Sequence, residues 1–106
     1  MILARTWRAQ IHDDRLHDYV AFLEERSYPM FRSLPGCLGV VFLRDGCEVT
    51  VVSVWKDADA IEALETNDLY NETVEELERR KILKSTDPVI VLGCDGFIAR
   101  ARWTGP

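Results

Sequence analysis

The sequence predicts a single α+β domain in which a four-stranded antiparallel sheet carries its helices on one face. Three observations lead to this prediction. The chain has 106 residues, which suits one domain. Strand-like and helix-like segments follow one another in the order β-α-β-β-α-β. The second and third strands are joined by a short turn, so they should lie side by side. This order is the split βαβ arrangement of ferredoxin-like folds.

The first strand and the first helix come from the first 34 residues. Residues 2–9 alternate loosely between apolar and polar side chains, which is typical of a strand. Asp13 and Asp14 are expected to cap the following helix by accepting hydrogen bonds from its free N–H groups. The inward residues of that helix are expected to be Leu16, Tyr19, Val20 and Leu23, followed by Met30, Phe31 and Leu34.

Proline and glycine divide the middle of the chain. Pro29 should kink or interrupt the first helix near Ser27, because proline lacks an N–H group and clashes with the preceding turn. Residues 38–44 form a second expected strand and residues 48–55 a third. Asp45-Gly46 between them predicts a type I′ turn, whose central residues need positive φ, and therefore an antiparallel hairpin.

Two further helices and a fourth strand are expected in the second half. Asp57 should cap a helix over residues 58–65, and Thr66-Asn67-Asp68 should end it and begin another that runs to about residue 83. Asp87-Pro88 leads into a strand over residues 89–94. The inward helix residues are expected to be Ile61, Leu64, Leu69, Tyr70, Val74 and Leu77.

The strands also predict a homodimer. Neither the second nor the third strand alternates cleanly with polar residues, so both faces of the sheet are apolar and need a cover. The helices cover one face, and a second copy of the sheet is the expected cover for the other. Residues 1–94 are expected to form the domain and residues 95–106 a C-terminal extension. Within it, residues 97–103 could add an edge strand, pair across the dimer, or remain an unordered end.

Composition argues against several classes of protein. The net charge is −5, and no basic stripe is present that could neutralise nucleic-acid phosphates. No segment has the roughly 18 apolar residues of a membrane span, and Arg5 and Arg8 interrupt the apolar start, unlike a signal peptide. The three cysteines form no CxxC pair, which favours a reducing compartment. We expect a cytoplasmic protein that binds neither nucleic acid nor membrane.

The common catalytic constellations are not found in the sequence. His12 and His17 are five residues apart, whereas two ligands on one helix face are three or four apart, so no metal site is expected. No glycine-rich loop supports a nucleotide cofactor, and no cofactor is expected. No histidine base can be placed with confidence beside a thiol, and no catalytic residue is assigned. The thiols concerned are Cys37, Cys47 and Cys94.

A family resemblance rests on residues 51–57, Val-Val-Ser-Val-Trp-Lys-Asp, followed by Ala60 and Ile61. This segment resembles the antibiotic-biosynthesis monooxygenase-like family, in which a hydrophobic strand ends in tryptophan before a polar helix cap. The likeness continues through residues 34–40 and, with residues 4–7 and Pro29, covers most of residues 2–94. It implies a dimeric α+β barrel with a pocket between helices and sheet for a flat, mostly apolar ligand.

The resemblance also implies an activity. It favours a monooxygenase that needs no cofactor and oxidises a quinol or a polycyclic aromatic with O₂. Two alternatives stay open: a non-catalytic ligand-binding or stress-associated dimeric barrel protein, and a cofactor-free isomerase or cyclase.

Two departures from the family pattern bear on this activity. In the haem-degrading branch, a tryptophan and a later histidine bind the haem, and Leu64 and Val74 stand at those places. Neither side chain can ligate iron and no histidine follows His17, so haem degradation is not expected. In some anthrone-type oxygenases an asparagine four residues before the strand tryptophan helps hold the substrate, and Val51 stands there.

Four residues are candidates to line the pocket: Trp55, Arg5, Trp7 and Tyr70. Trp55 could stack on an aromatic substrate or belong to the core. Arg5 shares a strand face with Trp7 and, as a buried charge, needs a partner. A substrate phenolate or carboxylate could serve, but an ion pair with a helix glutamate is favoured. Tyr70, like Tyr28, could donate a hydrogen bond, relay a proton or only pack.

Overall fold

A computed structural model describes residues 1–99 of the chain. The elements of the first half, in chain order, are β1 (Leu3–Ile11), the 3₁₀ turn η1 (Asp13–Arg15), α1 (Leu16–Phe22), the π turn η2 (Leu23–Ser27), α2 (Tyr28–Ser33) and β2 (Cys37–Asp45). The elements of the second half are β3 (Glu48–Trp55), α3 (Ala58–Glu62), the 3₁₀ turn η3 (Ala63–Thr66), α4 (Asp68–Arg79), β4 (Leu83–Thr86) and β5 (Ile90–Gly93).

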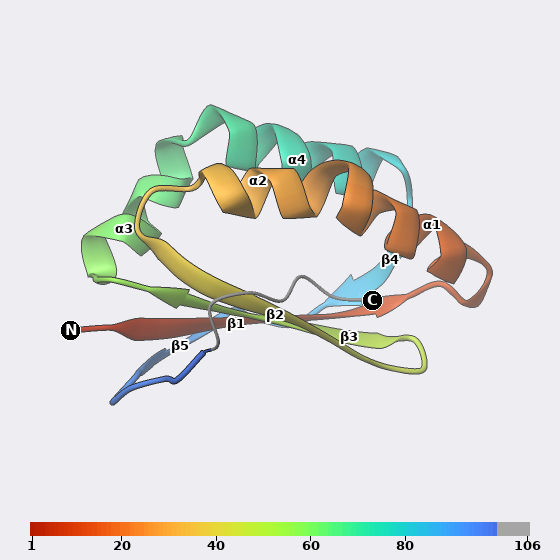
Figure 1. The fold of residues 1–106 in the computed structure, drawn as a ribbon. Coiled ribbons are helices and arrows are strands. Elements are labelled where there is room, and N and C mark those ends of the chain that lie inside the picture. The colour runs from red at the N-terminus through yellow and green to blue at the C-terminus, as the bar shows by residue number, and fades with distance from the viewer. Residues whose placement is uncertain (100–106) are drawn as a thin grey trace.

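The helices form one layer over one face of an open antiparallel sheet (Figure 1). The strand order is β2-β3-β1-β4, and β5 also pairs with β1. This arrangement confirms the predicted ferredoxin-like α+β fold. No helix within residues 1–99 is long and apolar enough to span a membrane.

The last helix ends earlier than predicted. It stops at Arg79 rather than near residue 83, because Lys81 has φ 58°, the left-handed conformation that ends many helices. The residues released from the helix form β4, a strand that the sequence did not predict. Its polar sequence, Leu-Lys-Ser-Thr, gave no apolar alternation that could have identified it.

The strands β4 and β5 form one edge of the sheet with an interruption. The first pairs with the end of β1, where Thr86 faces Ala9, and the second pairs with its start, where Ile90 faces Thr6. Three residues lie between Thr86 and Ile90 but only two between Thr6 and Ala9, so this edge of the sheet accommodates one extra residue. Pro88 lies in this gap, where its missing N–H breaks no ladder bond.

Pro29 interrupts the regular α-helix near Ser27, as predicted, but by a widened turn rather than by ending the helix. From α1 through η2 to α2 the helix is continuous, and the turn just before the proline is widened to a π turn, in which the Tyr28 N–H donates to the Leu23 carbonyl. A proline ring clashes with the carbonyl four residues before it in a regular α-helix, and the wider turn relieves this clash. Phe22, rather than the expected Val20, is buried here.

The start of the first helix also differs from the prediction. Neither Asp13 nor Asp14 caps it, because both lie inside the opening 3₁₀ turn, and no side-chain cap bond forms there. The Asp13 carboxylate instead accepts a hydrogen bond from the Cys47 thiol, with Sγ and Oδ1 3.2 Å apart. This bond ties the helix start to the β2–β3 hairpin.

The other predicted caps and the hairpin are present. Asp57 accepts from the Ala60 N–H at 2.9 Å, and Asn67 accepts from the Tyr70 N–H at 2.8 Å. Asp45 pairs with Glu48, so the turn is centred one residue later than expected, on Gly46 and Cys47. Gly46 has φ 61° and Cys47 does not have positive φ, a pattern that fits type II′ rather than type I′.

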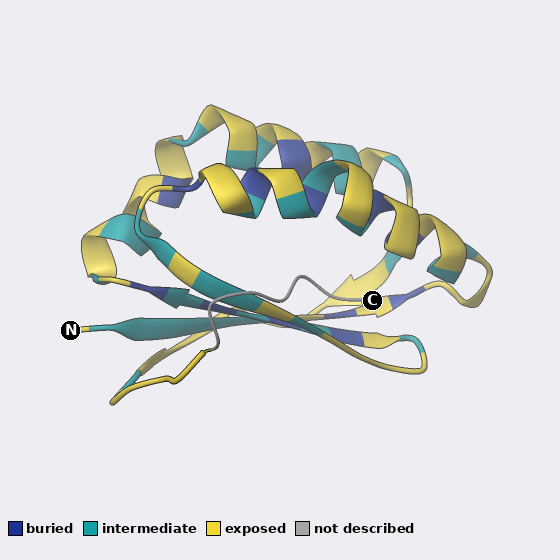
Figure 2. Ribbon diagram, in the orientation of Figure 1, coloured by how far each residue is buried: buried dark blue, intermediate teal, exposed yellow. Residues whose placement is uncertain are grey.

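The core lies between the two layers in two clusters (Figure 2). Alternate β3 residues point toward the helices and are buried, ending in Trp55 with no exposed surface. On α4 the buried position is Thr73, while Leu69, expected to face inward, is 43% exposed. The buried cluster members are Ala9, Ile11, Tyr19, Phe22, Val49 and Ile82 in one cluster, and Met30, Leu34, Trp55 and Leu64 in the other.

The face of the sheet opposite the helices is apolar and uncovered within the described chain. Val52 points to this face, because its neighbours Val51 and Ser53 are buried under the helices. Its cross-strand row consists of Val41, Val52, Thr6 and Ile90. Val41 and Ile90 are each 52% exposed, and Leu92, also on this face, is 59% exposed.

An ion-pair network joins α4 to the π turn. Glu76 contacts Arg79 at 2.6 Å and Arg80 at 2.7 Å, and Arg80 also contacts Glu25 at 3.2 Å. Hydrogen bonds from Arg79 and then Arg80 lower the pKa of Glu76 from 4.5 to about 2. The Arg80 guanidinium also lies 5.2 Å from the centre of the Phe22 ring.

We predict that Glu76→Gln lowers the free energy of unfolding at pH 7 and that the difference from the wild type shrinks in acid. The folded-state pKa of Glu76 is depressed, so its stabilisation is fully present above about pH 4.5 and is lost as the pH falls toward 2. Urea unfolding at pH 7 and pH 3 measures this, with the exposed Glu75→Gln as control. Equal losses for the two variants at pH 7 would contradict the assignment.

Candidate functional site

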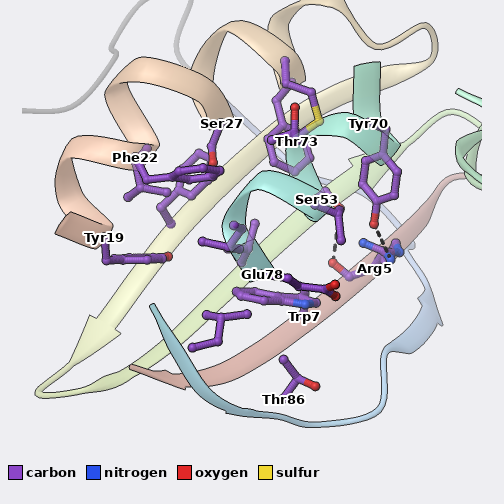
Figure 3. Close-up of a pocket in the computed structure, with 18 residues that line it drawn as sticks. Arg5, Trp7, Tyr19, Phe22, Ser27, Ser53, Tyr70, Thr73, Glu78 and Thr86 are labelled. Atoms are coloured by element: carbon purple, nitrogen blue, oxygen red, sulfur yellow. Dashed lines mark hydrogen bonds between the residues drawn. The ribbon is translucent and has the colours of Figure 1, made fainter. Parts of the chain in front are cut away.

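A cavity of about 190 Å³ lies between the helix layer and the sheet (Figure 3). Its walls are mainly apolar, and most of the aromatic side chains among them come from β1, β2, α1 and α2. The aromatic lining residues from these elements are Trp7, Tyr19, Phe22, Phe31 and Phe42. A flat apolar molecule would therefore meet ring faces and edges on several sides.

The buried polar side chains of the described chain gather at this cavity. Ser27, Ser53 and Thr73 are its buried polar residues, and all three line the cavity. Each comes from a different element, respectively η2, β3 and α4. Core positions usually carry apolar side chains, so this concentration of small hydroxyls marks the cavity as more than a packing gap.

The π turn contributes to the lining at both of its ends. Leu23 begins the turn and Ser27 ends it, and both side chains line the cavity. The wider turn brings these residues to the cavity in place of a regular helix face. Turns of this kind are frequent at functional sites.

Arg5 and Tyr70 form the charged part of the site. The Arg5 guanidinium donates from Nη2 to the Tyr70 hydroxyl oxygen at 3.0 Å, and its carbon lies 5.8 Å from the centre of the Tyr70 ring. Within residues 1–99 no carboxylate lies within 4 Å of this guanidinium, so the expected ion pair with a helix glutamate is wrong. Its partner on the helix, Tyr70, offers a hydroxyl oxygen instead.

Trp55, the fourth expected pocket residue, supports the site from behind rather than lining it. It is fully buried against Met30, Leu34 and Leu64. Its indole Nε1–H donates to the Ser53 hydroxyl at 2.8 Å, and that hydroxyl donates to the Arg5 carbonyl at 3.3 Å. Of the two alternatives that the sequence left open for Trp55, the structure shows the core position, while Arg5, Trp7 and Tyr70 do line the cavity.

Glu78 and Thr86 mark the mouth of the cavity. They are the two exposed members of the described lining, and they come from the end of α4 and from β4. Neither residue was among those predicted from the sequence to line the pocket. Thr86 lies in the unpredicted strand, but Glu78 follows Tyr70 and Val74 at intervals of four residues, which places all three on one helix face.

Tyr19 is a further lining residue that was expected only to pack. Burial raises the pKa of its hydroxyl from 10.0 to about 12. The hydroxyl therefore stays protonated at neutral pH and acts as a hydrogen-bond donor rather than a base. Tyr28 does not line the cavity but packs edge-on against Phe42, with ring centres 5.0 Å apart.

A second hollow, of about 330 Å³, lies on the surface beside α3. It is larger, but it contains no aromatic side chain, and Pro35, Lys56, Asp59 and Ala63 in its lining are exposed. Such a groove gives a flat apolar ligand little to stack on. No group of three or more potential metal ligands occurs in the described part of the chain.

One comparison with known proteins identifies a family. Residues 3–76 match the family model for antibiotic biosynthesis monooxygenase. No curated protein sequence matches the chain significantly.

Solved structures of similar fold cover nearly the whole chain at low identity. Rv0793 from Mycobacterium tuberculosis has a TM-score of 0.72 and 17% identity, covering 96% of this chain and 100% of its own. SnoaB from Streptomyces nogalater, a cofactor-independent oxygenase, has a TM-score of 0.72 and 15% identity, covering 93% of this chain and 98% of its own. NE2512 from Nitrosomonas europaea, a protein of unknown function, has a TM-score of 0.77 and 15% identity, covering 95% of this chain and 96% of its own. At such identities the likeness shows a shared fold.

We predict that Ser53→Ala destabilises the protein by about 1–3 kcal/mol, because the buried Trp55 N–H loses its acceptor. Urea unfolding measures the loss. In a Trp55→Phe background, which has no N–H to satisfy, the same substitution should cost clearly less. An equal cost in both backgrounds would show that the hydrogen bond is not the cause.

Proposed function

Because the chain belongs to the antibiotic biosynthesis monooxygenase family, we propose that it is an oxygenase that needs no cofactor and oxidises an electron-rich hydroxyarene such as a quinol. One observation carries this proposal. A guanidinium and a phenol hydroxyl, Arg5 and Tyr70, meet in a cavity whose other walls are mainly aromatic and apolar. The description of SnoaB as a cofactor-independent oxygenase supports the same reading.

The substrate supplies the electrons in this proposal. A hydroxyarene that has lost a proton is an electron-rich anion, and it can pass an electron to O₂ and then combine with the reduced oxygen at a ring carbon. Loss of water from the resulting hydroperoxide leaves a new carbonyl. One oxygen atom of O₂ enters the product, and the other leaves as water with two hydrogens from the substrate.

Arg5 and Tyr70 stabilise the substrate anion. Arg5 donates one N–H to the Tyr70 oxygen, and within residues 1–99 its other side-chain donors have no hydrogen-bond partner, so they can bind a ligand oxygen. The Tyr70 hydroxyl, which accepts from Arg5, keeps its own proton to donate to the same oxygen. Charge-assisted hydrogen bonds of this kind are the strong ones, and they gain strength where water is excluded.

The proposed proton acceptor lies at the mouth of the cavity. Glu78 is the one carboxylate in the described lining, and it is in contact with solvent. In the proposal it takes the substrate proton directly or through water. Tyr19 remains protonated because its pKa is about 12, so it orients the ligand rather than removing its proton. The aromatic walls hold the ring and keep water away.

We also propose that the protein acts as a homodimer in which the two uncovered sheet faces pack together. The row of Val41, Val52 and Ile90 exposes apolar surface that a monomer would leave in water. A cytoplasmic location belongs to the same proposal. The thiols of Cys37, Cys47 and Cys94 are free, which suits a reducing compartment.

We predict that Arg5→Ala lowers kcat/KM for quinol oxidation by roughly 100-fold or more, the usual cost of losing one stabilising donor. Tyr70→Phe, which keeps the ring, should lower it by about tenfold, equivalent to one hydrogen bond. Oxygen uptake with a panel of quinols is the measurement, and the exposed Arg32→Ala is the control.

Unchanged uptake in Arg5→Ala would contradict the assigned site. Saturable binding of the quinols without any uptake by the wild type would replace the oxygenase with a ligand-binding protein.

For the dimer, we predict that the wild type sediments at twice the chain mass of 12.2 kDa. Val41→Glu should give a monomer, because it places a charge in the apolar interface. Leu69→Glu is the matched control, since Leu69 is similarly exposed but lies on α4, in the helix layer. A wild type that stays monomeric at micromolar concentration would contradict the packing of the two sheets.

A further inference from the structure

We infer that the substrate is a hydroxyarene of one or two rings that carries no second negative charge. This inference rests on the proposed function and narrows it. Cavity size limits the number of rings, and the charges of the lining limit the charge of the ligand. Larger aromatics of three or four rings and hydroxyarenes that carry two negative charges are expected to be poor ligands.

The size limit follows from the volume. A closed apolar cavity of roughly 150 Å³ accepts benzene, so a cavity of about 190 Å³ holds one ring, with a second reaching toward the mouth. The walls are not free to retreat. Phe42 is held edge-on by Phe31 at 5.7 Å and by Tyr28 at 5.0 Å between ring centres. A third ring placed inside the cavity would have to displace this aromatic group.

Arg5 and Tyr70 together can bind one oxygen atom of the ligand. Arg5 is the single cation among the described lining residues, and its side chain has no carboxylate partner within 4 Å. In Figure 3 its guanidinium meets the Tyr70 hydroxyl across a hydrogen bond. A hydroxyl or phenolate placed there would gain donors from both residues, while its ring lies against Trp7.

The charge limit follows from Glu78. The described lining holds one positive side chain, Arg5, and one negative side chain, Glu78, so the site has no net charge before a ligand enters. A phenolate adds one negative charge that Arg5 can pair. A second negative charge on the ligand finds no cation in this lining and is repelled by the Glu78 carboxylate.

The test is anaerobic binding measured by isothermal titration calorimetry at low ionic strength, which separates binding from oxidation. The probes are 1-naphthol with two rings, anthrone with three rings, and 4-hydroxyphthalate, a single-ring phenol whose two carboxylates give it two negative charges at pH 7. The wild type is expected to bind 1-naphthol at least tenfold more tightly than either of the others.

The charge limit has its own pair of variants. Glu78→Gln should tighten binding of 4-hydroxyphthalate by about three- to tenfold at low salt, the effect of removing one nearby charge in a solvated site. The affinity for 1-naphthol, which carries no carboxylate, should change less. Glu75→Gln removes a charge from the same helix at a position outside the cavity lining and should change neither affinity.

Three results would overturn the inference. These are tight binding of anthrone, equal effects of the two glutamate variants, and no binding of 1-naphthol. Oxygen uptake by the same preparations in air tests the proposed function separately. If the probes bind in the expected order but no quinol supports oxygen uptake, the proposed oxygenase activity is refuted and the inferred ligand class stands. If anthrone supports oxygen uptake as well as two-ring quinols do, the oxygenase activity stands and the limit on ring number is refuted.

Discussion

The alternation of side chains along β1 is the constraint on which the rest of the structure depends. This strand is paired on both edges, with β3 on one side and with β4 and β5 on the other, so its register is fixed from two directions. Arg5 and Trp7 point to the helices, and Thr6 points to the uncovered face. A slip of one residue would exchange the two faces and remove both side chains from the cavity.

The cavity exists because of the residues that this register places side by side across the strands. On the side of the helices, Arg5 stands between Ser53 of β3 and Val91 of β5. Ser53 is too small to fill the space, and the residues above it include the small Ser27 and Thr73. Trp55 fills the adjacent part of the core completely and leaves this row hollow. A charged side chain thus enters an apolar layer at the point where the layer contains several hydroxyls and one phenol.

Most of the fold could be predicted from the sequence because its signals are local. The third strand, Glu48–Trp55, has the predicted bounds, and Asp57 and Asn67 cap helices as expected, since a short polar side chain before a helix acts on its own neighbours. The unpredicted strand has a tertiary origin. The strand Leu83–Thr86 exists because β1 offers it an edge, and its own side chains carry no strand pattern.

The site was predictable only in part for the same reason. Arg5, Trp7 and Tyr70 face the interior by periodicity, which a sequence displays. The partner of Arg5 depends on where α4 crosses the sheet, and the sequence could not tell a glutamate from a tyrosine there. Whether Trp55 lines a hollow or fills the core depends on the volume of its neighbours. The π turn that brings Leu23 and Ser27 to the cavity is a response to Pro29 that sequence rules describe only as a break.

The central claim is that a ligand oxygen binds the Arg5 guanidinium inside the cavity, and side-chain NMR tests it most directly. The arginine Nε–H resonances would be recorded while 1-naphthol is added without oxygen, and Arg5→Lys would assign the Arg5 signal. The account predicts that this signal shifts saturably and more than any other arginine signal. It would be contradicted if the Arg5 signal stayed fixed while ligand-induced shifts clustered at the surface hollow around Lys56 and Asp59.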